Sequence, residues 1–191
     1  MDGFLKNIVS PDQIEKHSAT LDKENPRDFI DVYLTAMEED EGLNVDDLAI
    51  SLYDFLMAGS ETSATFLKWL VLYLTLHPEV QDRCREEILR VIGANNCTVE
   101  DIQSLAYTQA TVAETHRLAA IAPVALTHQT LGRVEVEGFT FPSNSGFMSN
   151  LQFIMRDPNT FQSPETFSPE RFIGEDGRWV SGASAGFKII F

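Results

Sequence analysis

The sequence predicts a mostly helical α+β fold, in which long helices come first and a small sheet follows. Apolar residues recur at helical spacing over most of the chain up to about residue 119. From residue 124 onward, short alternating segments separated by Gly and Pro indicate strands and turns. Hydrophobic residues make up 43% and charged residues 23% of the 191 residues, which is typical of a folded globular chain.

The first part of the chain is expected to form three helices. A polar helix is expected over 12–23, and a second helix should run from Pro26 to Glu38. The dominant helix is expected over 45–76, with Asn44 as its N-cap. Because apolar residues occur almost all round this helix, we expect it to be buried on most sides and to lie through the middle of something larger than this chain.

Three more helices are expected before the sheet. One begins at Pro78 and ends near Ile92, where Gly93 closes it. A short helix should begin near Thr98, and another is expected over 107–119.

The last third of the chain is expected to hold short strands. Residues 134–136 and 139–141 alternate apolar and polar side chains around Gly138, which predicts a hairpin. A further strand is expected over 146–151, and an irregular meander over 168–172.

Charge and composition exclude several classes of protein. The net charge of −15 argues against a nucleic-acid surface and against a polybasic membrane anchor, both of which need clustered cations. Two cysteines are too few for a disulfide framework. We also expect no targeting segment and no membrane span, because charged residues interrupt the apolar stretches.

A polar motif interrupts the apolar pattern of the long expected helix at Ala58-Gly59-Ser60-Glu61-Thr62. Gly59 weakens a helix by roughly 1 kcal/mol relative to Ala. The Thr62 hydroxyl is expected to donate to the carbonyl four residues earlier and to distort the turn. The motif indicates either a functional site or a small-residue helix contact, and by itself it does not separate the two.

Two later motifs combine acids and arginines. Glu114 and Arg117 are three residues apart and share a helix face, where they form either an exposed pair or part of a network. Arg171 follows in the stretch Pro169-Glu170-Arg171-Phe172. Because one carboxylate can accept from two guanidinium groups, we predict a Glu114–Arg117–Arg171 network.

The order of these motifs, A-G-x-E-T, then E-x-x-R, then P-E-R-F, resembles that of the cytochrome P450 monooxygenases. The stretches Asn25–Asp31 and His77–Gln81 are similar to signature stretches of the microsomal drug- and lipid-oxidising branch. The resemblance covers residues 18–179, and it implies part of the cytochrome P450 fold. A helical scaffold that matches these motifs by chance would require all of them to be accidental.

The resemblance implies a haem cofactor and roles for particular residues. Glu61 and Thr62 match the acid and alcohol that deliver protons during oxygen activation, and Ala58, Gly59 and His128 match haem-contacting positions. Glu114, Arg117 and Arg171 match a structural triad. Residues implied to line the substrate cavity are Phe55, Ala122, Val124, Ala125 and Leu126. The segment 122–126 is also consistent with an ordinary strand that enters a core. His128 is also consistent with a strand histidine that has a local hydrogen-bond partner.

The expected iron-ligand loop, F-x-x-G-x-R-x-C-x-G, does not occur in this sequence, and residues 180–191 diverge from the family. Cys84 lies between Arg83 and Arg85, whose charges should lower its pKa, and Cys97 lies in a turn. Neither resembles the ligand, so no metal ligand is assigned, and thiolate-ligated haem is not expected in this chain. The chain is therefore expected to be a part of the family domain that is inactive by itself.

Partners follow from the resemblance as well. The parent enzyme would use an NADPH-dependent flavoprotein reductase, O2 and a small apolar organic substrate, on the cytosolic face of the endoplasmic reticulum membrane, through an anchor that this chain lacks. Two interpretations stay open: part of an active monooxygenase, or a non-catalytic truncated product without the iron ligand.

Overall fold

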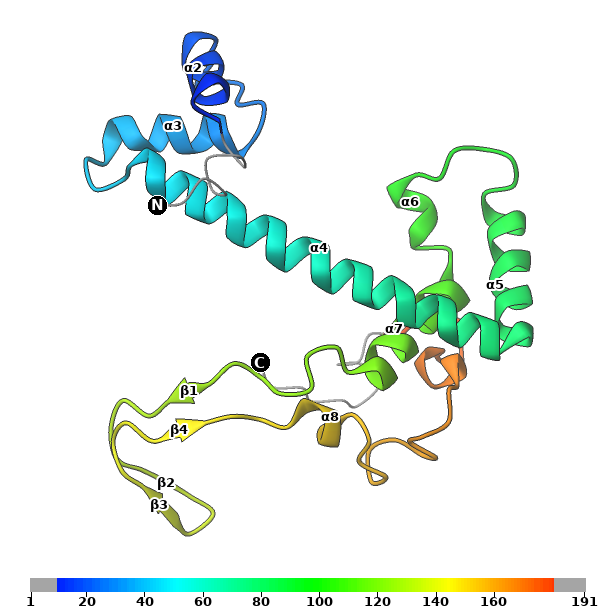
Figure 1. Ribbon diagram of the computed structural model, residues 1–191. Coiled ribbons are helices and arrows are strands. Elements are labelled where there is room, and N and C mark those ends of the chain that lie inside the picture. The colour runs from blue at the N-terminus through cyan, green and yellow to red at the C-terminus, as the bar shows by residue number, and fades with distance from the viewer. Residues whose placement is uncertain (1–9, 181–191) are drawn as a thin grey trace. The chain divides into compact units, whose positions relative to one another are not determined.

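The computed structural model describes residues 10–180 of the chain (Figure 1). The chain divides into two compact units, one ending at Ser63 and the other beginning at Ala64. Helices dominate the described residues and the strands are short, which confirms the predicted mostly helical α+β class.

The first unit begins with two capped helices, α2 (Pro11–Ala19) and α3 (Phe29–Glu39). Ser10 accepts a hydrogen bond from a backbone N–H at the start of α2, and Asp28 does the same for α3. The predicted start of the second helix at Pro26 is wrong, because Asp28 takes the cap position and leaves Pro26 outside the helix.

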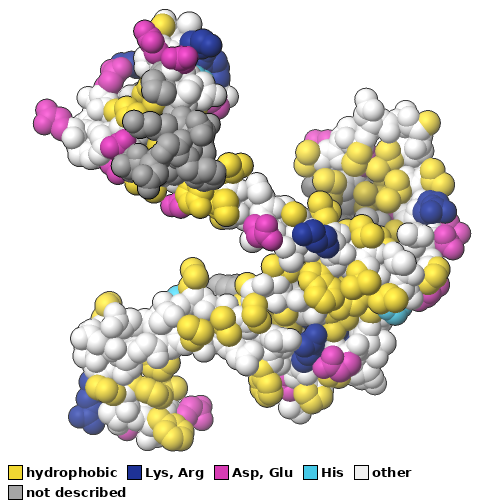
Figure 2. All heavy atoms as spheres, viewed as in Figure 1, with side chains coloured by type: hydrophobic (Ala, Val, Ile, Leu, Met, Phe, Trp, Pro, Cys, Tyr) yellow, Lys and Arg dark blue, Asp and Glu magenta, His cyan; other side chains and the backbone are white. Residues whose placement is uncertain are grey.

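Helix α4 (Val45–Leu76) has the predicted bounds. The Asn44 side chain caps it by accepting from the N–H groups two and three residues further on, at 2.9 and 3.1 Å. In the described chain, only Leu48 and Ala49 of α4 are buried. An all-round apolar helix needs packing elements on several sides, and the described residues do not supply them. Exposed apolar residues of α4 include Phe55, Leu56, Met57, Leu67, Trp69, Val71, Leu72 and Leu76 (Figure 2).

The second unit continues with α5 (Pro78–Val91) and the short α6 (Val99–Ile102). Gly93 adopts the left-handed conformation, φ +63°, just after α5, as expected of a residue that closes a helix. Thr98 forms a capping box at the start of α6.

Helix α7 (Ala106–Ala119) is capped by a side chain from another helix. Glu87 of α5 accepts hydrogen bonds from Tyr107 N at 2.9 Å and from Thr108 N at 2.8 Å. The cap residue of α7 itself, Leu105, provides no side-chain hydrogen bond. The contact between α5 and α7 therefore supplies what the local sequence of α7 lacks.

Two small antiparallel sheets follow. Strand β2 (Val134–Val136) pairs with β3 (Phe139–Phe141) in the predicted hairpin, with Val134 opposite Phe141. Both turn residues, Glu137 and Gly138, have positive φ, which is typical of a tight hairpin turn. Strand β1 (His128–Gln129) pairs with β4 (Gly146–Phe147).

The predicted strand over 146–151 ends earlier, because Asn150 caps the short helix α8 (Leu151–Ile154). The predicted meander contains a 3-10 turn, η1 (Pro169–Phe172), which packs on α7. Among the described helices, none has both the length and the apolarity needed to cross a membrane. Two apolar clusters form the core of the second unit: Val80, Cys84, Tyr107, Leu118 and Phe167, and Ala110, Phe161 and Phe172.

Candidate functional site

The predicted polar motif lies on α4 without interrupting the helix. Thr62 Oγ1 donates a 2.6 Å hydrogen bond to the carbonyl oxygen of Ala58. Apart from its chain neighbours and the backbone of α4 itself, a Cβ added at Gly59 would meet no atom of the described residues within 4 Å, so the space beside this turn is open in the described part of the chain. Phe55, Ala58, Gly59 and Thr62 are spaced three and four residues apart and therefore share one side of α4. Glu61 is exposed on the same turn. This side offers an aromatic ring, small groups and one hydroxyl.

Glu114, Arg117 and Arg171 form a network inside the second unit. Glu114 is 0% exposed and Arg117 is 2% exposed. Arg117 donates to the two carboxylate oxygens of Glu114 from Nε at 2.7 Å and from Nη2 at 2.8 Å. Arg171 Nε of η1 donates to Glu114 Oε1 at 3.0 Å, and so does Ser168 N. Four hydrogen bonds therefore surround the carboxylate, which is the completeness that a buried charge requires.

The other nitrogens of the two guanidinium groups donate hydrogen bonds to backbone carbonyl oxygens. Arg117 Nη1 donates to Met155 O at 2.8 Å. Arg171 donates to Gln162 O at 3.0 Å and to Thr166 O at 3.1 Å. The network therefore fixes the loops that precede η1, and its saturated carboxylate is suited to positioning rather than to proton transfer.

The predicted substrate-lining segment, 122–126, is extended and open to the surroundings. Val124 forms an isolated antiparallel bridge with Asn150, and Leu126 is 86% exposed. The ring of His128 is exposed on β1, two residues further on. This segment belongs to the second unit, whereas Ala58–Thr62 belongs to the first.

The two cysteines lie in different surroundings. Cys84 is buried, with Sγ 3.3 Å from Thr111 Oγ1. Burial raises the pKa of the Cys84 thiol and outweighs the opposing effect of Arg83. Arg83 lowers this pKa as expected, but the net shift is upward because burial has the larger effect. Cys97 is exposed and donates to the carbonyl of Thr98 at 3.6 Å.

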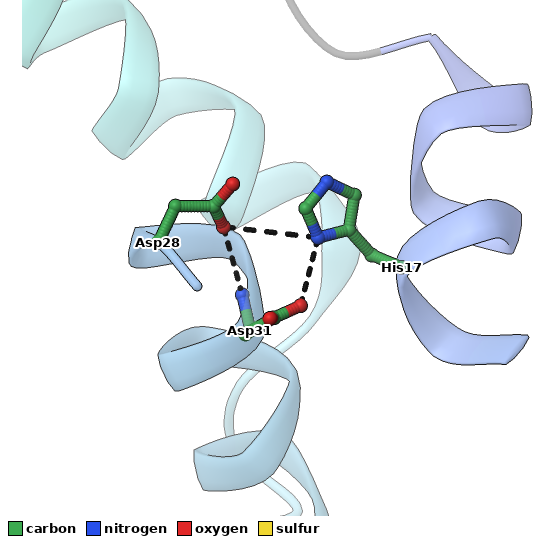
Figure 3. Close-up of side chains that lie close together, drawn as sticks. All are labelled: His17, Asp28 and Asp31. Carbon is green, nitrogen blue, oxygen red and sulfur yellow. Dashed lines mark hydrogen bonds and ion pairs between the residues drawn. The ribbon is translucent and has the colours of Figure 1, made fainter. Parts of the chain in front are cut away.

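A second polar cluster, His17, Asp28 and Asp31, lies between α2 and α3 (Figure 3). Asp31 is 0% exposed, and its Oδ1 is 2.7 Å from His17 Nδ1. Arg27 donates three hydrogen bonds to Asp31, from its N, Nε and Nη2 atoms. The Arg27 guanidinium holds the pKa of Asp31 well below its usual range. The Arg27 guanidinium already neutralises the charge of the Asp31 carboxylate. The cluster is therefore a polar link between α2 and α3 and not a metal site.

The sequence did not predict this polar link, although Arg27 and Asp31 lie in the signature-like stretch Asn25–Asp31. His17 is fourteen residues from Asp31, and no local pattern connects the two. The cap made by Glu87 was missed for the same reason.

Comparisons with known proteins agree on one family. The family model "Cytochrome P450" matches residues 8–187 of this chain. Cytochrome P450 2U1 of Homo sapiens is 38% identical over 184 residues, which cover 93% of this chain and 33% of that protein. The Bos taurus protein of the same name is 37% identical with the same coverage, and cytochrome P450 2L1 of Panulirus argus is 34% identical over 173 residues. The chain spans about a third of the length of the curated relatives that it matches.

Proposed function

Because this chain belongs to the cytochrome P450 family, we propose that it forms part of a haem-dependent monooxygenase of the microsomal branch. Such an enzyme inserts one atom of O2 into an apolar organic substrate and reduces the other atom to water. When bound, haem supplies the oxygen-activating chemistry. The observation that carries the proposal is the side of α4 that presents Ala58, Gly59 and the Thr62 hydroxyl next to open space.

The described residues fit contact with a haem but not its axial ligation. A flat apolar macrocycle needs small side chains where a helix passes close to it, and Ala58 and Gly59 provide them. Its carboxylate substituents need donors, and the exposed His128 ring offers one. Cys84 is buried and hydrogen-bonded to Thr111, and Cys97 is exposed. We propose that neither of them holds the iron. The chain by itself is accordingly proposed to be inactive.

Thr62 and Glu61 are proposed to handle protons. The Thr62 hydroxyl donates to the Ala58 carbonyl, so its oxygen lone pairs stay available to accept from a water molecule. The exposed carboxylate of Glu61 on the same turn can exchange protons with solvent. Together they would pass protons from solvent into an apolar pocket. Residues proposed to line that pocket are Phe55, Ala122, Val124, Ala125 and Leu126.

The Glu114–Arg117–Arg171 network is proposed to hold the frame and to take no part in proton transfer. The partners proposed for the whole enzyme are an NADPH-dependent flavoprotein reductase, O2 and a small apolar substrate. The proposed location is the cytosolic face of the endoplasmic reticulum membrane, by analogy with the microsomal branch.

The proposal is tested in a complete cytochrome P450 in which this chain replaces the matching third of the Homo sapiens relative. We expect haem binding, and product formation coupled to NADPH consumption. Thr62→Val should lower product formed per NADPH by about tenfold or more without loss of haem, and Thr62→Ser should restore it.

Thr75→Val is the matched control, since Thr75 makes the same kind of back-bond, to Val71 O at 2.7 Å, on the same helix. Equal effects of the Thr62 and Thr75 substitutions would refute the proton role. A chimera that folds without haem would refute the larger proposal.

A further inference from the structure

The turn that carries Arg171 is also held through the preceding residue, Glu170. Glu170 Oε1 accepts hydrogen bonds from Tyr107 OH at 3.2 Å and from Arg83 Nη1. Its Oε2 accepts from Ser168 Oγ at 3.0 Å. The Arg83 guanidinium also lies over the Tyr107 ring, 3.8 Å from the ring centre, in a cation–π contact. One side chain from α5, one from α7 and one from η1 therefore meet here.

This cluster and the buried network contact α7 at two separate points. Tyr107 and Glu114 are seven residues apart, so they lie on the same side of α7, on the order of 10 Å from each other. Two consecutive residues of η1, Glu170 and Arg171, bind these two points. Ser168 and Arg171 attach the turn to Glu114, and Glu170 adds a second attachment on α7 that further restricts how the turn can rotate.

We infer that Arg83, Tyr107 and Glu170 form a second anchor that sets the direction in which the chain leaves η1. The chain beyond η1 is built on this turn, because Ile173 N donates to Glu170 O at 3.0 Å and Val180 N donates to Phe172 O at 2.9 Å. The consequence for activity rests on the proposed function: if an iron-ligand loop follows this turn, these positioning residues decide where that loop begins.

The two anchors differ in their exposure to solvent. The Glu114 and Arg117 side chains are 0% and 1% exposed, whereas those of Arg83 and Glu170 are 53% and 51% exposed. Dissolved salt screens exposed ion pairs much more than buried ones. The second anchor should therefore weaken as salt is added. Burial raises the pKa of Tyr107 to about 12, so its hydroxyl stays a proton donor at physiological pH.

The test is amide hydrogen exchange on the full 191-residue chain, followed at Ile173 and Val180. Tyr107→Phe, which removes only the hydroxyl, and Arg83→Gln should each speed exchange at both amides by about fivefold. Exchange in the last turn of α7 should not change. Raising NaCl from about 0.05 M to about 1 M should speed exchange in the unaltered chain but not in the Arg83→Gln chain.

Arg85→Gln is the matched control, because Arg85 pairs with Asp82 on the exposed side of α5, at 3.7 Å. Unchanged exchange in Tyr107→Phe and Arg83→Gln, or the same acceleration in Arg85→Gln, would overturn the inference. So would a lack of protection at Ile173 in the unaltered chain. The measurement needs no haem, and a failure of the monooxygenase proposal would leave its result unaffected.

Discussion

Replacing Glu114 by Gln should destabilise the second unit severely. The substitution keeps the volume of the side chain but removes the negative charge that Arg117 and Arg171 share. The new amide group also places N–H donors where the carboxylate accepted hydrogen bonds. Arg117, at 2% exposure, would be left as a buried charge without a counterion. Breaking a buried pair in this way costs about 3–5 kcal/mol, a large part of a typical stability of about 5–15 kcal/mol.

Urea unfolding followed by circular dichroism measures this loss. We expect a lower midpoint with an unchanged slope, because the surface exposed on unfolding stays the same. Glu86→Gln is the control, since Glu86 is an exposed residue of α5 and should change stability by about 0.5 kcal/mol or less. A loss below about 1 kcal/mol for Glu114→Gln, or one equal to the control, would refute the reasoning. An unaltered chain without a cooperative transition would refute it as well.

Three further predictions concern ionisable groups. Cys97 should react with a thiol reagent much faster than Cys84, whose pKa is raised by burial; equal rates in mass-resolved labelling would contradict the structure. The Arg27 guanidinium lowers the pKa of Asp31, so the stability that Asp31 contributes is present above about pH 5 and falls as the pH is lowered. Asp31→Asn should therefore be most destabilising in urea unfolding near neutral pH, and a loss that is constant down to acid pH would contradict this. Burial lowers the pKa of His116, so its imidazole should titrate below about 6.5 in an NMR titration of the folded chain, and a midpoint above that value would count against the packing described.

Features of the fold with local causes were predicted well. Asn44 caps α4 and the helix has the bounds read from its pattern, because a cap and a periodic run lie within a few residues of each other. The β2–β3 hairpin follows from Gly138 in the same way. Helix α8 was missed because its cap, Asn150, sits in a stretch that reads equally well as a strand. The apolar pattern of α4 predicted burial inside something larger than this chain, and the described residues cover little of the helix.

In the candidate site as well, contacts between residues close in the sequence were predicted and most contacts between distant residues were not. Glu114 and Arg117 are three residues apart, so their pairing follows from helix geometry alone. Arg171 was added because one carboxylate can accept from two guanidinium groups, and the family resemblance then matched the same three residues to a structural triad. The Glu170 contacts to Arg83 and Tyr107 span 87 and 63 residues, and no motif relates these positions. Long-range contacts of this kind depend on how helices pack, which local spacing does not encode.

The cap that Glu87 provides bears on the order in which this region folds. The first turn of α7 has no acceptor of its own at Leu105, so Tyr107 N and Thr108 N gain partners only after α5 has docked. Helix α7 should therefore not mature before α5, and the two should open and close as one cooperative unit. If α7 forms while α5 is still undocked, its helical hydrogen bonding should be lost first at its N-terminal end, near Tyr107. The start of α7 is thus tied to a single carboxylate on a neighbouring helix.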